Sequence, residues 1–199
     1  MKRRQKTIKM VTLAILIAIV AVLQALGLGI KIGPYSISLV GVPIVLGAIL
    51  LGPRAGMILG FTFALVVMFS PDVTAFMGIN PFYTILIVFG KAMLGGFVSG
   101  IVYKALKKAN NTLACIVASI TFPIVNTGVF VIGVSLLFNG WLNETAAATG
   151  ASAFYFLFVV LVGINFLIEF GINAVLSPVI ARLSVIGFDR LMLEEKRGK

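Results

Sequence analysis

The feature that most constrains this chain is a succession of long apolar stretches separated by short polar segments. A helix needs about 20 mostly apolar residues to cross a bilayer, so 199 residues accommodate about six crossings with short connections. Hydrophobic residues make up 60% of the chain and charged residues 11%, whereas soluble domains have about 45–50% and about 25%. The sequence therefore predicts an all-α integral membrane protein, a bundle of about six transmembrane helices in a single membrane domain spanning residues 1–199. We expect these helices at residues 8–28, 38–51, 55–69, 82–106, 112–138 and 153–183.

The positively charged residues predict the orientation. If the N-terminus is cytoplasmic, only Lys31 of the 16 Lys and Arg residues falls in an outer loop, and Lys91 lies within a helix. Cytoplasmic segments of membrane proteins carry this excess, so we predict that both termini are cytoplasmic and that the basic first segment leads into a retained helix. The formal net charge of +10 is then a topology signal and does not indicate nucleic-acid binding.

The chain lacks the residues that several kinds of chemistry require. The chain has no histidine, and its one cysteine, Cys115, lies in an apolar run where packing is the expected role. The Gly-x-x-x-x-Gly-Lys-Ser/Thr loop of nucleotide-hydrolysing proteins is absent from the sequence. We therefore predict a protein that is not an enzyme, has no cofactor or metal, and does not hydrolyse ATP by itself.

A layer of polar residues crosses the predicted bundle. Lys91 precedes Lys104, and Glu169 precedes Arg182, by the same number of residues. At about 1.5 Å per residue, Lys91 and Glu169 each lie about 20 Å from the inner boundary, and Asn126 falls at a similar depth. Two interpretations of this polar layer stay open. Its side chains either form hydrogen bonds between helices, worth about 0.6 kcal/mol each, or they form the floor of a ligand pocket that opens to the outside.

Glu169 also belongs to a polar stripe along its own helix. A charge that faces lipid costs at least about 2.5–3.5 kcal/mol, so this stripe must point into the bundle. Its members recur every four residues and are Asn165, Glu169, Asn173 and Ser177.

The predicted outer loops differ from the inner ones. Residues 29–37, 70–81 and 139–152 form longer segments that are richer in Gly, Pro, Ser, Thr and Asn. Long loops on one face of a protein often serve recognition and gating. The alternative is that these segments only connect the helices.

Small residues predict close helix contacts. The first helix carries an alanine stripe, which allows another helix to approach closely, either inside the protein or from a separate membrane partner. Its members are Ala14, Ala18, Ala21 and Ala25. Further small residues, expected to serve internal packing, are Gly52, Gly56, Gly60, Gly96 and Gly100.

The topology, the Ala14-x-x-x-Ala18 motif and the turn of residues 51–56 (Leu-Gly-Pro-Arg-Ala-Gly), followed by Gly60, occur together in this chain. In this combination, over about residues 10–186, the chain resembles the substrate-binding (S) component of energy-coupling-factor vitamin transporters. Residues 122–128 (Phe-Pro-Ile-Val-Asn-Thr-Gly) are most similar to the pantothenate-specific group.

The resemblance implies a multi-pass subunit of the bacterial cell membrane that captures a vitamin from outside. Such a subunit delivers its ligand by reorienting against a transmembrane scaffold subunit, while two separate ATPase subunits hydrolyse ATP. Ala14 and Ala18 match the positions with which this family contacts the scaffold.

The buried polar residues suit pantothenate, which offers one carboxylate, one amide and two hydroxyls. We expect Lys91 to bind the carboxylate, and Asn126 and Asn165 to bind the amide and hydroxyls. Glu169 either holds Lys91 in place or accepts a hydroxyl. The residues expected to close the site from the loops are Ser36, Ser38 and Asn80, with the rings of Tyr35 and Tyr83.

Other functions remain open at this point. The substrate of such a subunit is alternatively riboflavin, folate, niacin or thiamine. A self-sufficient secondary transporter or channel would place Lys91 and Glu169 on an ion path, although no internal repeat supports it. A structural or assembly subunit, or a membrane enzyme, is the third possibility.

Overall fold

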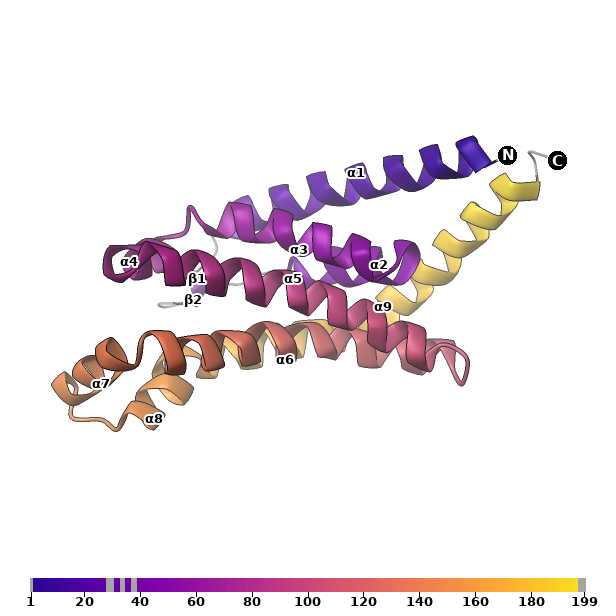
Figure 1. Ribbon diagram of the computed structural model, residues 1–199. Coiled ribbons are helices and arrows are strands. Elements are labelled where there is room, and N and C mark those ends of the chain that lie inside the picture. Colours follow the sequence, from indigo (N-terminus) through magenta and orange to yellow (C-terminus); the bar gives the residue numbers. More distant parts are fainter. Residues whose placement is uncertain (1, 28–30, 33–34, 37–38, 197–199) are drawn as a thin grey trace.

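The computed structural model describes residues 2–27, 31–32, 35–36 and 39–196, and helices dominate it (Figure 1). Helix α1 (Lys2–Gly27) is followed by two short antiparallel strands, β1 (Lys31–Ile32) and β2 (Tyr35–Ser36), with Lys31 opposite Ser36. The remaining elements are α2 (Gly41–Leu51), α3 (Pro53–Val67), α4 (Pro71–Ile79), α5 (Pro81–Leu106), α6 (Asn111–Leu137), α7 (Asn139–Ala148), α8 (Ala153–Tyr155), the π-helix η1 (Phe156–Leu161) and α9 (Gly163–Lys196).

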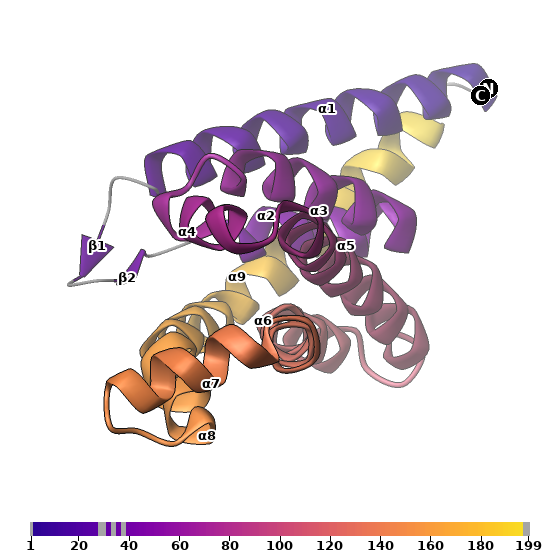
Figure 2. The same cartoon turned by 60° about the vertical axis from the view of Figure 1, so that its left-hand side comes forward.

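The two ends of the bundle differ in their connections. Helix α1 begins and helix α9 ends at one end, side by side in both views (Figures 1 and 2). The short helices α4, α7 and α8 gather at the opposite end. Both chain ends therefore lie on the same side of the bundle.

The long helices identify a multi-pass membrane protein. Among the described residues, parts of α1, α5, α6 and α9 are long and apolar enough to cross a membrane. Residues 139–148 and 153–161, bent by 100°, provide a fifth crossing if the pair counts as one. Helices α2 and α3 have 11 and 15 residues, or about 16 and 22 Å, which is less than the roughly 30 Å hydrocarbon core. The count of six crossings thus stays a prediction.

Helices α3 and α5 pack through glycines. A Cβ on Gly56 would meet the carbonyl oxygen of Gly96, and a Cβ on Gly60 would meet that of Ala92. The two backbones are therefore in contact, as small residues permit in membrane bundles. The prediction of internal packing is confirmed for Gly56, Gly60, Gly96 and Gly100, whereas Gly52 forms the turn between α2 and α3 with a positive φ of 100°.

Two segments predicted as outer loops are largely helical, which corrects the sequence analysis. Residues 70–81 contain α4, and residues 139–152 contain α7. Ser70 caps α4 because its Oγ accepts a hydrogen bond of 3.3 Å from the N–H of Val73, and Pro71 fits the first helical turn. Helix α7 ends in three alanines, which have the highest helix propensity.

The predicted helix over residues 153–183 is interrupted, which is a second correction. The chain forms α8 and then η1, and α9 begins only at Gly163 and continues to Lys196. The N–H of Val162 bonds to the carbonyl of Leu157, 3.1 Å away and five residues earlier. A Cβ on Gly163 would lie 3.1 Å from the Phe158 carbonyl oxygen, so a glycine suits the interruption.

Candidate functional site

A cavity of about 520 Å³ lies inside the half of the bundle that carries α4 and α7. Its wall is built from α1, α3, α4, α5, α6, α7 and the region where η1 meets α9. This volume is within the range of about 300–1,000 Å³ that is typical of small-molecule sites.

The four helix residues predicted to bind a ligand all line this cavity. Lys91 comes from α5, Asn126 from α6, and Asn165 and Glu169 from α9. The three helices thus bring residues far apart in the sequence into one wall.

Lys91 and Glu169 place opposite charges in the cavity. The Lys91 Nζ lies 5.0 Å from the centroid of the Phe130 ring, a cation–π distance. The Lys91 ammonium also attracts the Glu169 carboxylate. Glu169 is partly buried and lines the cavity.

Asn126 is the most informative polar residue of the wall. Its side chain is only 6% exposed, and its Oδ1 has no hydrogen-bond partner among the described residues. A buried acceptor without a partner costs about 1–3 kcal/mol. Since Asn126 is among the residues that line the cavity, a donor group on a bound molecule that reaches this oxygen would remove that cost.

The polar stripe of α9 points into the bundle as predicted, and its two halves have different surroundings. Asn165 and Glu169 line the cavity. Asn173 and Ser177 are buried against neighbouring helices instead, and the Asn173 Nδ2 donates to the Glu169 carbonyl at 2.9 Å. A Cβ on Gly41 would lie 2.6 Å from the Asn173 Oδ1, so α2 approaches α9 through this glycine.

An aromatic wall, which sequence analysis missed, lies beside the polar one. The Phe76 ring centroid is 5.1 Å from that of Trp141, 5.4 Å from that of Phe138 and 6.0 Å from that of Phe130. All four side chains line the cavity. Because the chain has 16 phenylalanines, their positions do not distinguish a cavity wall from other apolar surfaces. Only the single tryptophan, in a segment predicted to be an outer loop, could have indicated an aromatic wall.

Sequence analysis also missed several polar residues of the wall. Gln24 is 6% exposed and lines the cavity from α1. It was detectable from the sequence, because it is an amide near the end of the long apolar part of this helix. Thr84 lines the cavity too, but its hydroxyl donates to the Asn80 carbonyl at 2.8 Å. Ser70 and Thr127 complete this group.

Two of the residues predicted to close the site from the loops, Asn80 and Tyr83, are not among the residues that line the cavity. Asn80 caps α5, because its Oδ1 accepts a 3.1 Å hydrogen bond from the N–H of Tyr83. The Tyr83 ring packs on Phe138, with 6.0 Å between the centroids. Ser36 belongs to β2, as does Tyr35, but the predictions for their side chains and for Ser38 fall outside the described residues.

The interrupted helix forms part of the cavity wall. Val160, Leu161 and Val162 line it at the junction of η1 and α9. π-Helical segments within helices are frequent at functional sites, because they displace side chains from the regular helical positions. Here the interruption falls directly before Asn165.

The donors and acceptors of the wall are an ammonium, a carboxylate, amides and hydroxyls, set against aromatic rings. Such a surface suits a small solute with both polar and apolar parts. Fold and cavity together define a multi-pass membrane protein with an internal cavity that polar and aromatic side chains line.

The chain matches the profile of the family described as "ECF transporter, substrate-specific component" over residues 8–181, and it belongs to this family. No curated protein matches the chain significantly. The family comprises transporter subunits, not enzymes, that serve the uptake of vitamin-type substrates together with an energy-coupling-factor module.

Proposed function

We propose that this chain is the pantothenate-binding S component of an energy-coupling-factor importer in a bacterial cell membrane. It captures the vitamin from outside and releases it inward by reorienting against a transmembrane scaffold subunit, while two separate ATPase chains hydrolyse ATP. The observation that carries the proposal is the single cavity shared by Lys91, Asn126, Asn165 and Glu169.

Lys91 binds the pantothenate carboxylate. An ammonium and a carboxylate form a charge-assisted hydrogen bond, about twice as strong as a neutral one. Among the described residues that line the cavity, Lys91 is the only cation. Glu169 keeps the empty cavity near neutral, which lowers the cost of holding Lys91 among apolar helices.

The two hydroxyls and the amide of pantothenate pair with the remaining polar groups. Asn126 offers an acceptor without a partner, and Glu169 offers a carboxylate that accepts a hydroxyl hydrogen. Asn165 offers both donors and an acceptor. The geminal methyl groups of pantothenate pack on the aromatic wall of Phe76 and its neighbours.

The proposed topology has six crossings with both termini in the cytoplasm. The excess of cations at the chain ends supports this orientation. The cavity then lies in the outer half of the bundle, below α4 and α7, where a solute from outside enters first.

The scaffold subunit docks on α1 at Ala14 and Ala18. Both alanines are exposed in the isolated chain, and only 17% of the apolar part of α1 is buried. This exposure favours a separate partner over internal packing, and the small side chains allow a second helix to approach closely.

Calorimetry on the purified chain tests the substrate. We expect one pantothenate per chain to bind tightly, and riboflavin, folate, niacin and thiamine to give no heat at the same concentrations. Lys91→Ala should weaken pantothenate binding at least about tenfold, whereas Lys107→Ala, an exposed cation beyond α5, should leave it unchanged. Equal affinity of the Lys91→Ala variant would remove the carboxylate contact from the proposal.

A self-sufficient transporter is the second candidate, because Lys91 and Glu169 place two opposite charges within membrane-crossing helices. Flux of pantothenate into liposomes that contain only this chain, driven by a proton or sodium gradient, would favour it. The S-component proposal expects no such flux unless the scaffold, the ATPases and ATP are present.

A further inference from the structure

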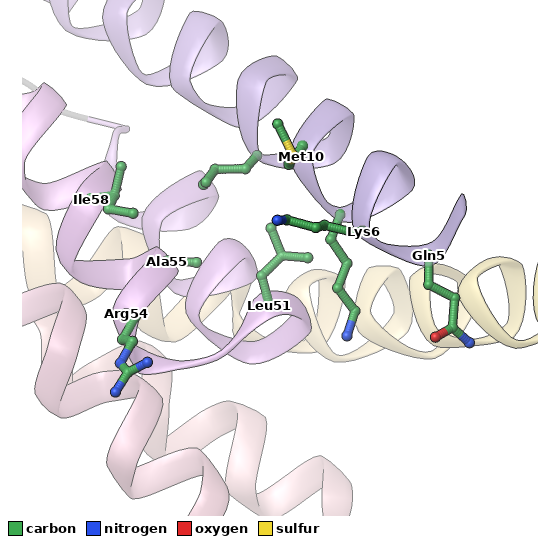
Figure 3. Close-up of a pocket in the computed structure, with 9 residues that line it drawn as sticks. Gln5, Lys6, Met10, Leu51, Arg54, Ala55 and Ile58 are labelled. Atoms are coloured by element: carbon green, nitrogen blue, oxygen red, sulfur yellow. The ribbon is translucent and has the colours of Figure 1, made fainter. Parts of the chain in front are cut away.

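A second hollow lies near the chain ends, between the start of α1 and the start of α3 (Figure 3). Its volume is about 480 Å³. Three cations line it, Lys6 and Lys9 from α1 and Arg54 from the first turn of α3. The other side chains used below are the apolar Met10, Leu13 and Ile58. We call this hollow the basic groove.

Three cations lie close to the basic groove, and the side chains described around it are otherwise uncharged. Lys104 adds a fourth positive charge nearby, because its Nζ is 3.6 Å from the position of a Cβ on Gly52. In the sequence, the three acidic residues at the end of the chain, Asp189, Glu194 and Glu195, are accompanied by four basic ones, Arg190, Lys196, Arg197 and Lys199. The groove therefore has a local positive excess.

The groove joins a membrane-facing surface. Met10 lines it and is 61% exposed, and the neighbouring Val11 is 52% exposed. Figure 3 shows Lys6 and Met10 on α1 facing Leu51, Ala55 and Ile58 across the hollow. Charged groups and exposed apolar side chains thus stand within one helical turn of each other, as at the edge of a bilayer.

We propose that the basic groove binds an anionic phospholipid. Lys6, Lys9 and Arg54 hold its phosphate, and one acyl chain lies along Met10, Leu13 and Ile58. Basic pockets between membrane helices on the cytoplasmic side are suited to anionic headgroups, and this end of the bundle carries most of the cations of the chain.

A soluble phosphate would use only half of this site, because the apolar part of the groove would stay uncovered. The proposal depends on the membrane setting of the chain and not on the identity of its vitamin.

Native mass spectrometry of the detergent-purified full chain tests the proposal. We expect phosphatidylglycerol to be retained at least about fivefold more tightly than phosphatidylcholine with the same acyl chains. The triple variant Lys6→Gln, Lys9→Gln, Arg54→Gln should lose at least about tenfold in phosphatidylglycerol affinity. Because the three side chains are not buried, we expect thermal unfolding of this variant to match that of the wild type.

The matched control is Lys107→Gln with Lys108→Gln, which removes exposed cations from the turn after α5. We expect it to change phosphatidylglycerol affinity by less than about twofold. An equal loss in this control, or full retention by the triple variant, would overturn the proposal. Displacement of the lipid by inorganic phosphate or glycerol 3-phosphate would overturn it in favour of a soluble anion. Normal lipid binding by a triple variant that no longer assembles with the scaffold would overturn it in favour of a protein contact.

Discussion

Replacing Asn126 with leucine is expected to stabilise the empty protein and to weaken ligand binding at the same time. The two side chains have the same number of heavy atoms and both branch at Cγ, but leucine has no acceptor to leave without a partner. The buried Oδ1 of Asn126 costs about 1–3 kcal/mol in the empty protein. At about 2–4 °C per kcal/mol for a chain of this size, Asn126→Leu should raise the melting temperature by at least about 2 °C.

The bound state should respond in the opposite direction. A ligand hydroxyl that donates to Asn126 would face a methyl group in the variant and lose its partner. This loss corresponds to about 1.5 kcal/mol or more, which is at least about a tenfold increase in the dissociation constant. Asn126→Leu should therefore melt higher than the wild type without pantothenate and show a smaller rise when pantothenate is added.

Thermal unfolding with and without pantothenate, together with calorimetric affinities, measures both effects. The control is Ser119→Ala on the same helix, because Ser119 is fully buried and its hydroxyl already donates to the Cys115 carbonyl at 2.8 Å. This control should not stabilise the empty protein or change the affinity. If Asn126→Leu destabilised the empty protein and left the affinity within about twofold, the assignment of Asn126 as a ligand contact would be refuted.

Two further predictions concern packing and assembly. Gly60→Ala should lower the melting temperature and the yield of folded protein, because the new Cβ meets the Ala92 backbone, whereas Gly78→Ala in α4 has open space and should be tolerated or stabilising. Ala14→Trp and Ala18→Trp should block co-purification with the scaffold and spare calorimetric pantothenate binding, while Ile19→Trp, a similarly exposed change on another side of α1, should spare both. A scaffold complex of normal yield with both alanines replaced would contradict the docking proposal.

The polar layer could be predicted from the sequence because a bilayer makes buried charge costly. Lys91 and Glu169 had to avoid lipid, and their spacing from the inner cations placed them at one depth. The stripe that includes Asn165 followed from four-residue spacing on one helix. These arguments need only helical geometry, so they predicted which side chains meet in the cavity.

The rest of the site depended on features that this kind of reasoning does not resolve. Phe76 and Phe130 carry no signal that distinguishes a cavity wall from a lipid-facing surface in such an apolar chain. Asn80 looked like a ligand contact, but an asparagine followed by proline is also a helix cap, and this local role is the one the structure shows. The interruption before Gly163 depends on tertiary contacts with neighbouring helices, which hydrophobic periodicity does not report.

Trp141 allows the central claim to be tested directly, because it is the single tryptophan of the chain and lines the cavity. The measurement is a titration of its fluorescence with pantothenate in the purified protein. We predict a saturable change at one ligand per chain, with an affinity that matches calorimetry and falls at least about tenfold in Lys91→Met. Calorimetric binding that leaves Trp141 fluorescence unchanged, or that survives Lys91→Met intact, would place the ligand outside this cavity.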